Sequence, residues 1–163
     1  VAFIVIALFL LLWYRLPGLI AILALGMYVA LNLALFKLIP VTMTAAGIGG
    51  LILSIGMAVD ANILIFERMK EELRRGKNLE DAMREGFARA WLSIRDSNLS
   101  SIITAAILFW FASTSIIKGF ALVFGLGVLV SMFTAITASR TFLMAVRLKE
   151  SKAAKFLFSS GIR

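Results

Sequence analysis

The chain has 163 residues, of which 61% are hydrophobic and 16% are charged, and its formal net charge is +8. So large an apolar share lies outside the range of soluble globular domains and indicates a protein that resides in a lipid bilayer. The sequence contains no cysteine and no histidine, which excludes disulfides, thiolate chemistry and histidine proton carriers, and we expect neither a cofactor nor a bound metal.

Five apolar runs follow one another along the chain. Residues 1–14 are too few to cross about 30 Å of hydrocarbon, so we interpret this run as an incomplete span. Longer runs predict transmembrane helices at 18–36 and 44–66, and again at 97–117 and 119–142. The sequence therefore predicts an all-α, polytopic helical bundle, with membrane helices in 1–66 and 96–146, a cytoplasmic segment at 67–95 and a basic tail at 147–163.

Basic residues are distributed unequally between the two sides of such a bundle. When the five spans are threaded back and forth, Arg15, the eight basic residues of 67–96 and the six of 140–163 fall on one side. The other side receives only Lys37 and Lys118. The positive-inside rule therefore predicts a multi-pass membrane protein with a cytoplasmic C-terminus. Basic loops of this kind fix topology and meet anionic lipid headgroups, so we expect no nucleic-acid partner.

The cytoplasmic segment is expected to contain two helices. Helical character continues through ERMKEELRR to Gly76, a natural helix stop. A second helix begins at Asn78, with Asp81 three residues later as in a capping box, and carries an apolar stripe over 79–91. We expect this amphipathic helix to lie along the inner membrane surface, although its pattern is also compatible with a docking surface for a partner.

Small residues recur every four positions along two of the spans. Such stripes allow helix backbones to approach closely in lipid. The residues expected to pack between helices are Gly50, Ser54 and Ala58 in one span, extended by Ala46 and Asn62, and Gly127, Ser131 and Ala135 in the last, extended by Ser139. Gly56 is expected to pack as well, and because it lies one turn before Asp60 it leaves room beside that carboxylate.

Asp60 interrupts an otherwise uncharged stretch, SIGMAVDANILIF. It lies seven residues, or roughly 10 Å of helix rise, before Glu67, the first charged residue of the cytoplasmic segment. This depth predicts a carboxylate that is buried within the membrane and is not on the surface of the protein. Intramembrane acids are costly and mark ion pathways, so we interpret Asp60 as a group that gains and loses a proton; a static hydrogen bond between helices is the alternative.

The start of the fourth span, SIRDSNLSS, adds further polar groups. Arg95 is a candidate counter-charge for Asp60, although Arg95 and Asp96 are also placed to reach interfacial water. Asn98 lies deeper and, with Ser101, forms a face suited to pack near Asp60 and to hold water or a proton. The candidate ion relay therefore consists of Asp60, Asn98, Arg95 and Asp96.

Two long strings carry a resemblance to a known family. They are GMAVDANILIFERMKEELRRGKNLEDAMREGFARAWLSIRDSNLSS and, after it, IKGFALVFGLGVLVSMFTAITASR. In the order and spacing of VDAN, FERMKEE, DSNLSS and SMFTA, the chain resembles the C-terminal membrane region of the SecD family of protein-export membrane proteins, within the RND superfamily. The resemblance covers essentially the whole chain.

The resemblance implies helices two to six of an RND-type half-transporter in the inner membrane of a bacterial cell. It implies a SecF-type partner that completes a pseudo-symmetric unit, association with the SecYEG channel, and an unfolded polypeptide as cargo. Asp60 matches the family's intramembrane aspartate. The resemblance thus implies that inward proton flow through Asp60 drives late-stage protein translocation, and that the protein is not an enzyme.

Three alternatives stay open at this stage. Another RND-type exporter, of lipids or drugs, would carry an acid in a similar place. An intramembrane aspartyl protease would need two carboxylates converging on one water, and Asp60 alone lies deep in a span. The coupling ion could also be Na⁺, because Asp60 together with Asn62 and Ser54 offers hard oxygen ligands.

Overall fold

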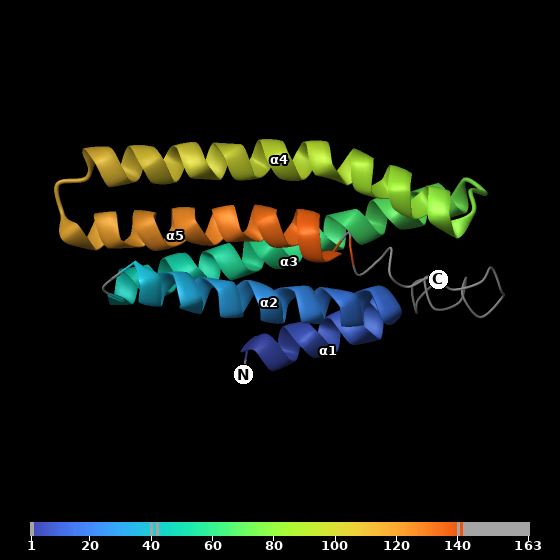
Figure 1. Ribbon diagram of the computed structural model, residues 1–163, viewed down its shortest axis with the longest axis horizontal. Coiled ribbons are helices and arrows are strands. Elements are labelled where there is room, and N and C mark those ends of the chain that lie inside the picture. The colour runs from blue at the N-terminus through green and yellow to red at the C-terminus, as the bar shows by residue number, and fades with distance from the viewer. Residues whose placement is uncertain (1, 40, 42, 140, 142–163) are drawn as a thin grey trace.

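The computed structural model describes residues 2–39, 41, 43–139 and 141. Five α-helices and a final π-helical turn follow one another: α1 (Ala2–Tyr14), α2 (Leu16–Leu38), α3 (Ala45–Arg74), α4 (Leu79–Phe111), α5 (Ser115–Thr134) and η1 (Ala135–Ser139) (Figure 1). The described part of the chain contains no strand, so the predicted all-α bundle is confirmed. Helices satisfy their own backbone hydrogen bonds, which a bilayer requires.

Among the residues that the structure describes, three helical segments are long and apolar enough to cross a membrane, namely Leu16–Leu38, Ala45–Arg74 and Ser115–Thr137. The first helix, α1, has only 13 residues and folds back along α2 (Figure 1). The turn between them is tight, because a Cβ on Gly18 would lie 2.0 Å from the carbonyl oxygen of Leu10. This close approach brings Tyr14, the last residue of α1, towards α3.

The stripes of small residues lie where α3 meets α5. A Cβ on Gly50 would lie 2.9 Å from the carbonyl oxygen of Phe120, and one on Gly127 would lie 2.3 Å from Oγ of Ser54. The Ser54 hydroxyl also shares a hydrogen bond of 2.6 Å with the hydroxyl of Tyr28 from α2. One face of α3 is therefore packed against both α5 and α2.

Gly56 does not belong to this packed face. It is exposed, and an added Cβ would meet no atom within 4 Å. The expectation that Gly56 packs between helices is therefore wrong within this chain. Gly56 follows Ser54, which contacts α5, by two residues or about 200° of helix rotation, and so it points away from α5. The open space beside Asp60, which the sequence also predicts, is present.

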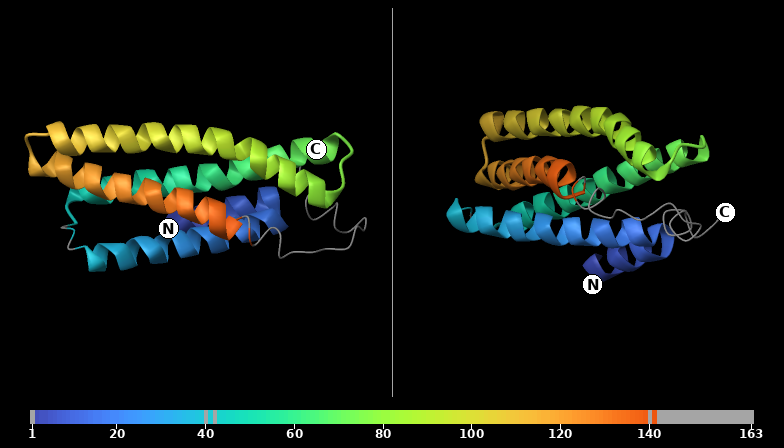
Figure 2. Two further views of the ribbon diagram at one scale, coloured as in Figure 1. Left: turned by 45° about the horizontal axis from the view of Figure 1, so that its top comes forward. Right: turned by 45° about the vertical axis from the view of Figure 1, so that its right-hand side comes forward.

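The helix predicted over 79–91 does not form a separate surface helix. Residues Leu79–Phe111 form one continuous helix, α4, of 33 residues or about 50 Å. Its first half packs against the extension of α3, which runs to Arg74, and this α3–α4 hairpin projects beyond the end of α5 (Figure 2). A Cβ on Gly86 would lie 2.6 Å from the backbone of Met69, so the two helices are in backbone contact there.

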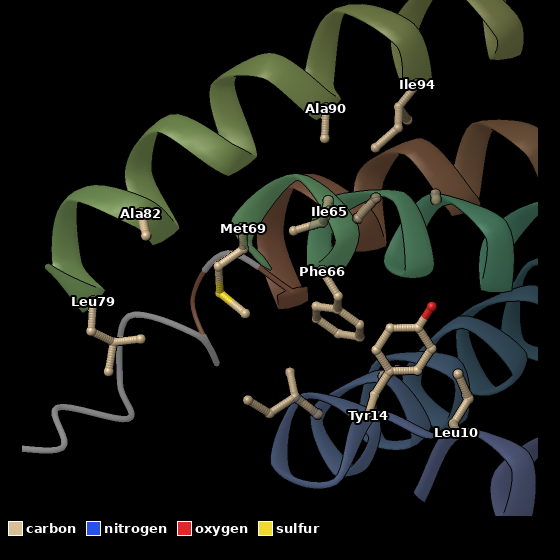
Figure 3. Packing of buried hydrophobic residues seen from close by; sticks show 13 residues of the cluster. Leu10, Tyr14, Ile65, Phe66, Met69, Leu79, Ala82, Ala90 and Ile94 are labelled. Atoms are coloured by element: carbon tan, nitrogen blue, oxygen red, sulfur yellow. The ribbon is translucent and has the colours of Figure 1, made fainter. Parts of the chain in front are cut away.

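The helix differs from the expectation because its apolar stripe is covered by another helix and not by lipid. We expected the lipid surface to cover the stripe, but α3 covers it. One buried cluster joins the two helices (Figure 3). It contains Ile65 and Met69 of α3, together with Leu79, Ala82, Ala90 and Ile94 of α4. An amphipathic pattern specifies a buried face without specifying what buries it.

A buried ionic cluster holds the tip of the hairpin. The carboxylate of Glu72, fully buried near the end of α3, forms ion pairs with Arg75, Lys77 and Arg89. Hydrogen bonds from Lys77 to Glu72, the larger cause, and to Glu85 raise the pKa of Lys77 above its ordinary value. The stabilisation from Lys77 is therefore fully present at neutral pH and is lost only as the pH rises through that raised pKa.

The predicted boundary between the last two spans also needs correction. We expected spans at 97–117 and 119–142, divided at Lys118, but α4 ends at Phe111 and α5 begins at Ser115. Thr114 caps α5, because its side chain accepts a hydrogen bond from the backbone N–H of Ile117. A helix boundary is set by such a cap rather than by the nearest charge. The predicted tail at 147–163 lies outside the described residues.

The backbone contact at Gly86 makes a specific prediction for the hairpin. We expect Gly86→Ala to lower the free energy of unfolding by about 1–3 kcal/mol, because the added methyl group must push α4 away from α3. Thermal unfolding of the purified protein in detergent measures the effect. Gly26→Ala is the control, since Gly26 is an exposed helix residue with open space around it and alanine is the better helix former. Equal unfolding temperatures for Gly86→Ala and wild type would contradict the hairpin.

Candidate functional site

A groove of about 390 Å³ lies between α3 and α4. A groove of this size has room for several water molecules. Its lining combines apolar side chains with four polar ones, and consists of Met57, Asp60, Ala61, Ile63, Leu64 and Glu67 from α3 and Ile94, Ser97 and Asn98 from α4. The groove therefore has room for water, and two acids, Asp60 and Glu67, lie along its α3 wall.

Asp60 lies in this groove and is exposed. Among the residues that the structure describes, none forms a hydrogen bond or ion pair with its carboxylate. The described part of this chain therefore does not cover the carboxylate, and its depth within the membrane stays a prediction. The reason is that Ser54 and Ala58, on the packed face of α3, are buried against α5 and α2, which leaves Asp60 on the opposite side.

Asn98 is the predicted relay residue that the structure brings to Asp60. It is 2% exposed and lines the groove from α4, next to Ser97. The hydroxyls of Ser97, Ser100 and Ser101 donate hydrogen bonds to carbonyl oxygens of their own helix. Of the polar residues in DSNLSS, Ser97 and Asn98 line the groove.

Arg95 and Asp96 are not brought to the same place. The Nε of Arg95 donates to Oδ1 of Asp96 at 2.9 Å, and both side chains are exposed. Neither residue lines the groove. In this structure the guanidinium of Arg95 is thus paired with its chain neighbour and not with Asp60.

Sequence reasoning missed a polar cluster at the far end of the groove. There the hydroxyl of Tyr14 donates to Oε1 of Glu67 at 2.8 Å, and Nζ of Lys70 donates to the same oxygen at 3.0 Å. The ammonium of Lys70 also lies 4.2 Å from the centre of the Tyr14 ring, which packs beside Phe66 (Figure 3). The seven-residue spacing between Asp60 and Glu67 could have indicated that both acids share one helix face.

The ligands considered for a sodium ion do not come together around Asp60. Ser54 is fully buried and bonds Tyr28, on the side of α3 that faces α2, whereas Asp60 lies in the groove beside α4. Within the described ranges, no group of three or more acidic side chains is placed to hold a metal ion. Glu67, the other groove acid, is two helix turns from Asp60, too far for two carboxylates to share one water.

These features define a class of protein. Long apolar helices with a polar groove between two of them define a polytopic helical membrane protein. The chain belongs to the MMPL family, whose model matches residues 1–154.

Within this class the chain is similar to protein-export subunits. It is 60% identical over 144 residues to the protein translocase subunit SecD of Thermobaculum terrenum, and the match covers 86% of this chain and 28% of that protein. Its identity to the protein translocase subunit SecDF of Bacillus subtilis is 47% over 142 residues, covering 87% of this chain and 19% of that protein. The resemblance to the SecD family is thus confirmed. These relatives are named as translocase subunits, a transport role and not an enzymatic one.

A solved structure agrees with these relatives. The crystal structure of SecDF, a translocon-associated membrane protein from Thermus thermophilus, matches with a TM-score of 0.87 and 37% sequence identity, and the match covers 99% of this chain and 22% of that one. The expected RND-type helical bundle is confirmed. The chain spans between 19% and 28% of the length of these relatives.

The position of Asp60 predicts its accessibility to water. Because the chain has no cysteine, Asp60→Cys would introduce a single thiol. We expect a small charged thiol reagent to modify it at least about tenfold faster than Ser54→Cys, since a thiol must reach water to ionise and react. Ser54→Cys is the matched control on the packed face of the same helix. Equal rates of modification, followed by mass spectrometry, would contradict the groove.

Proposed function

We propose that this chain is the ion-coupling membrane part of a SecD-type protein translocase subunit. In this role, Asp60 carries protons inward across the membrane and the resulting shape change drives the late stage of protein translocation. The observation that carries the proposal is the carboxylate of Asp60, which pairs with none of the described residues and lies in a groove between α3 and α4 that has room for water. The similarity to SecD and SecDF supports the cargo, an unfolded polypeptide leaving the cell.

The energy for this coupling comes from moving one charge through the membrane potential. That movement is worth about 2.3 kcal/mol per 100 mV for each proton. A carboxyl that is charged in one arrangement of α3 and α4 and neutral in another responds to this energy by favouring one arrangement. Gly56, one turn before Asp60, supports such a change because a Cβ there would meet no atom within 4 Å.

The proton is the coupling ion that the geometry favours. A sodium site needs several hard oxygen ligands around the ion, and Ser54 lies on another face of α3 from Asp60. A proton needs only one titratable group and a water path. An intramembrane protease is disfavoured because the second groove acid, Glu67, does not converge on Asp60.

A membrane partner of the SecF type is expected to cover the exposed groove. Asp60 and its neighbours on α4 would be costly against lipid. Large apolar side chains on the same two helices are also exposed, among them Ile52, Leu99 and Ile103. A second half-bundle laid on this face would shield the acid and complete the groove. Association of the pair with a SecYEG channel follows from the similarity to translocase subunits.

The basic residues suggest how the chain is oriented. The α3–α4 hairpin carries Arg74, Arg75 and Arg84, which are exposed at its tip. By the positive-inside rule this end of the bundle lies in the cytoplasm of a bacterial cell, and so does the C-terminus.

The proposal predicts that Asp60→Asn abolishes the response of export to a proton gradient. Asparagine keeps the size and hydrogen-bonding capacity of the side chain but cannot titrate, so the bundle and its assembly with the partner are preserved. Export of a secreted protein into inverted membrane vesicles, with and without a gradient, measures the effect. A wild-type gradient response in an assembled Asp60→Asn complex would mean that the carboxylate is structural.

Two further variants sharpen this test. Asp60→Glu still titrates, so it is expected to retain part of the gradient response. Arg95→Ala is expected to reduce export much less than Asp60→Asn does, because Arg95 is exposed and paired with Asp96. A complete loss of the gradient response in Arg95→Ala would place the arginine in the relay and contradict its surface assignment.

A further inference from the structure

We propose that Glu67 is a second proton carrier, located at the basic end of the same groove, which accepts the proton from Asp60 and releases it to water. The inference rests on the proposed function and extends it to a residue, Glu67, that the sequence presents only as the start of a charged loop. Tyr14 and Lys70 act as positioning residues that hold the Glu67 carboxylate.

The groove itself connects the two acids. Asp60 and Glu67 both line it and are separated by two helix turns, or about 10 Å. This distance is too long for direct transfer and is spanned by a short chain of waters. The α4 side supplies Ser97 and Asn98, whose hydroxyl and amide groups can hydrogen-bond such a chain.

The carboxylate of Glu67 is held at one oxygen only. Tyr14 and Lys70 both donate to Oε1, and within the described residues no hydrogen bond reaches Oε2. The Glu67 side chain is 46% exposed, whereas that of Lys70 is 9% exposed. Oε1 is therefore held by two donors, whereas Oε2 has no donor among the described residues, which is the arrangement needed to take up and release a proton.

The charges around Glu67 favour transfer in one direction. Lys70 is its direct counter-ion, and the charge of Arg74, one turn further along α3, acts on it as well. From α1 the only titratable group that faces it is Tyr14, and α4 presents no titratable group to the groove. Nearby cations stabilise a carboxylate, so Glu67 holds a proton only briefly and returns to its charged form.

The transfer is balanced without any further reactant. The O–H bond of protonated Asp60 breaks as a water takes the proton, and an O–H bond forms at Oε2 of Glu67 as the last water in the chain gives a proton up. Neutral Glu67 loses its ionic attraction to Lys70, while the hydrogen bond from Tyr14 to Oε1 can persist. Loss of the proton from Oε2 to bulk water restores the ion pair.

The test uses the full-length subunit assembled with its partner in inverted vesicles. We expect Glu67→Gln to slow gradient-driven export at least tenfold. We also expect the export rate of this variant to depend less on the pH on the cytoplasmic side of the membrane. The amide oxygen of glutamine still accepts from Tyr14 and Lys70, so a purely structural Glu67 would leave the rate and the pH profile unchanged. Glu67→Asp, which still titrates, is expected to restore part of the rate with a shifted pH profile.

Glu71→Gln is the matched control, because Glu71 lies one turn further along α3, pairs with Arg68 and, at 3.4 Å, with Arg89, and does not line the groove. It is expected to export at the wild-type rate. If Glu67→Gln matches wild type while Asp60→Asn loses the gradient response, the role of Glu67 is refuted and the proposed function stands. If Asp60→Asn keeps the gradient response, the proposed function is refuted, and the role of Glu67 that rests on it is refuted as well. Should Glu67→Gln not assemble, an unchanged pH profile in Glu67→Asp would refute the proposal instead.

Discussion

The close approach of α3 and α5 is the contact on which the rest of the bundle depends. In a bilayer, lipid is as apolar as a leucine side chain, so helices associate through close backbone packing and a few hydrogen bonds. Gly50 against Phe120 and Gly127 against Ser54 allow this approach, and the hydroxyl pair of Tyr28 and Ser54 ties α2 to the same place. These contacts fix the rotation of α3 about its own axis.

The rotation of α3 decides where the chemistry lies. With Ser54 and Ala58 turned towards α5 and α2, Asp60 must face the other side, where α4 crosses it. The α3–α4 hairpin then continues past the other helices, held by the backbone contact at Gly86 and by the ion pairs of Glu72. One packed face thus produces both a polar groove and a long helical hairpin that continues from it.

The sequence predicted most of the elements, because their signals are local. Apolar runs, the stop at Gly76 and the cap at Asn78 are each encoded within a few residues, and the small-residue stripes mark the faces that pack. Long-range facts were not predictable in this way. The stripe of Leu79, Ala82 and Ala90 does not reveal that α3 covers it, and an intramembrane aspartate does not reveal that this chain leaves it exposed.

The same limit explains the site. Asn98 could be predicted to lie near Asp60, because both are polar positions on neighbouring apolar helices. The cluster of Glu67 with Tyr14 could not, since these residues are 53 positions apart and meet only when α1 folds back on α2. Arg95, which the pattern offered as a counter-charge, is instead paired with Asp96, and only the three-dimensional structure separates these two outcomes.

Independent control of the two ion gradients tests the central claim most directly. Vesicles that contain the complete subunit and its partner can be given a pH gradient without a sodium gradient, and then the reverse, while export of one secreted protein is timed. A groove that moves protons through a carboxyl predicts that export accelerates with the pH gradient and is unchanged by the sodium gradient. Acceleration by the sodium gradient alone, or by neither gradient, would contradict this account of Asp60.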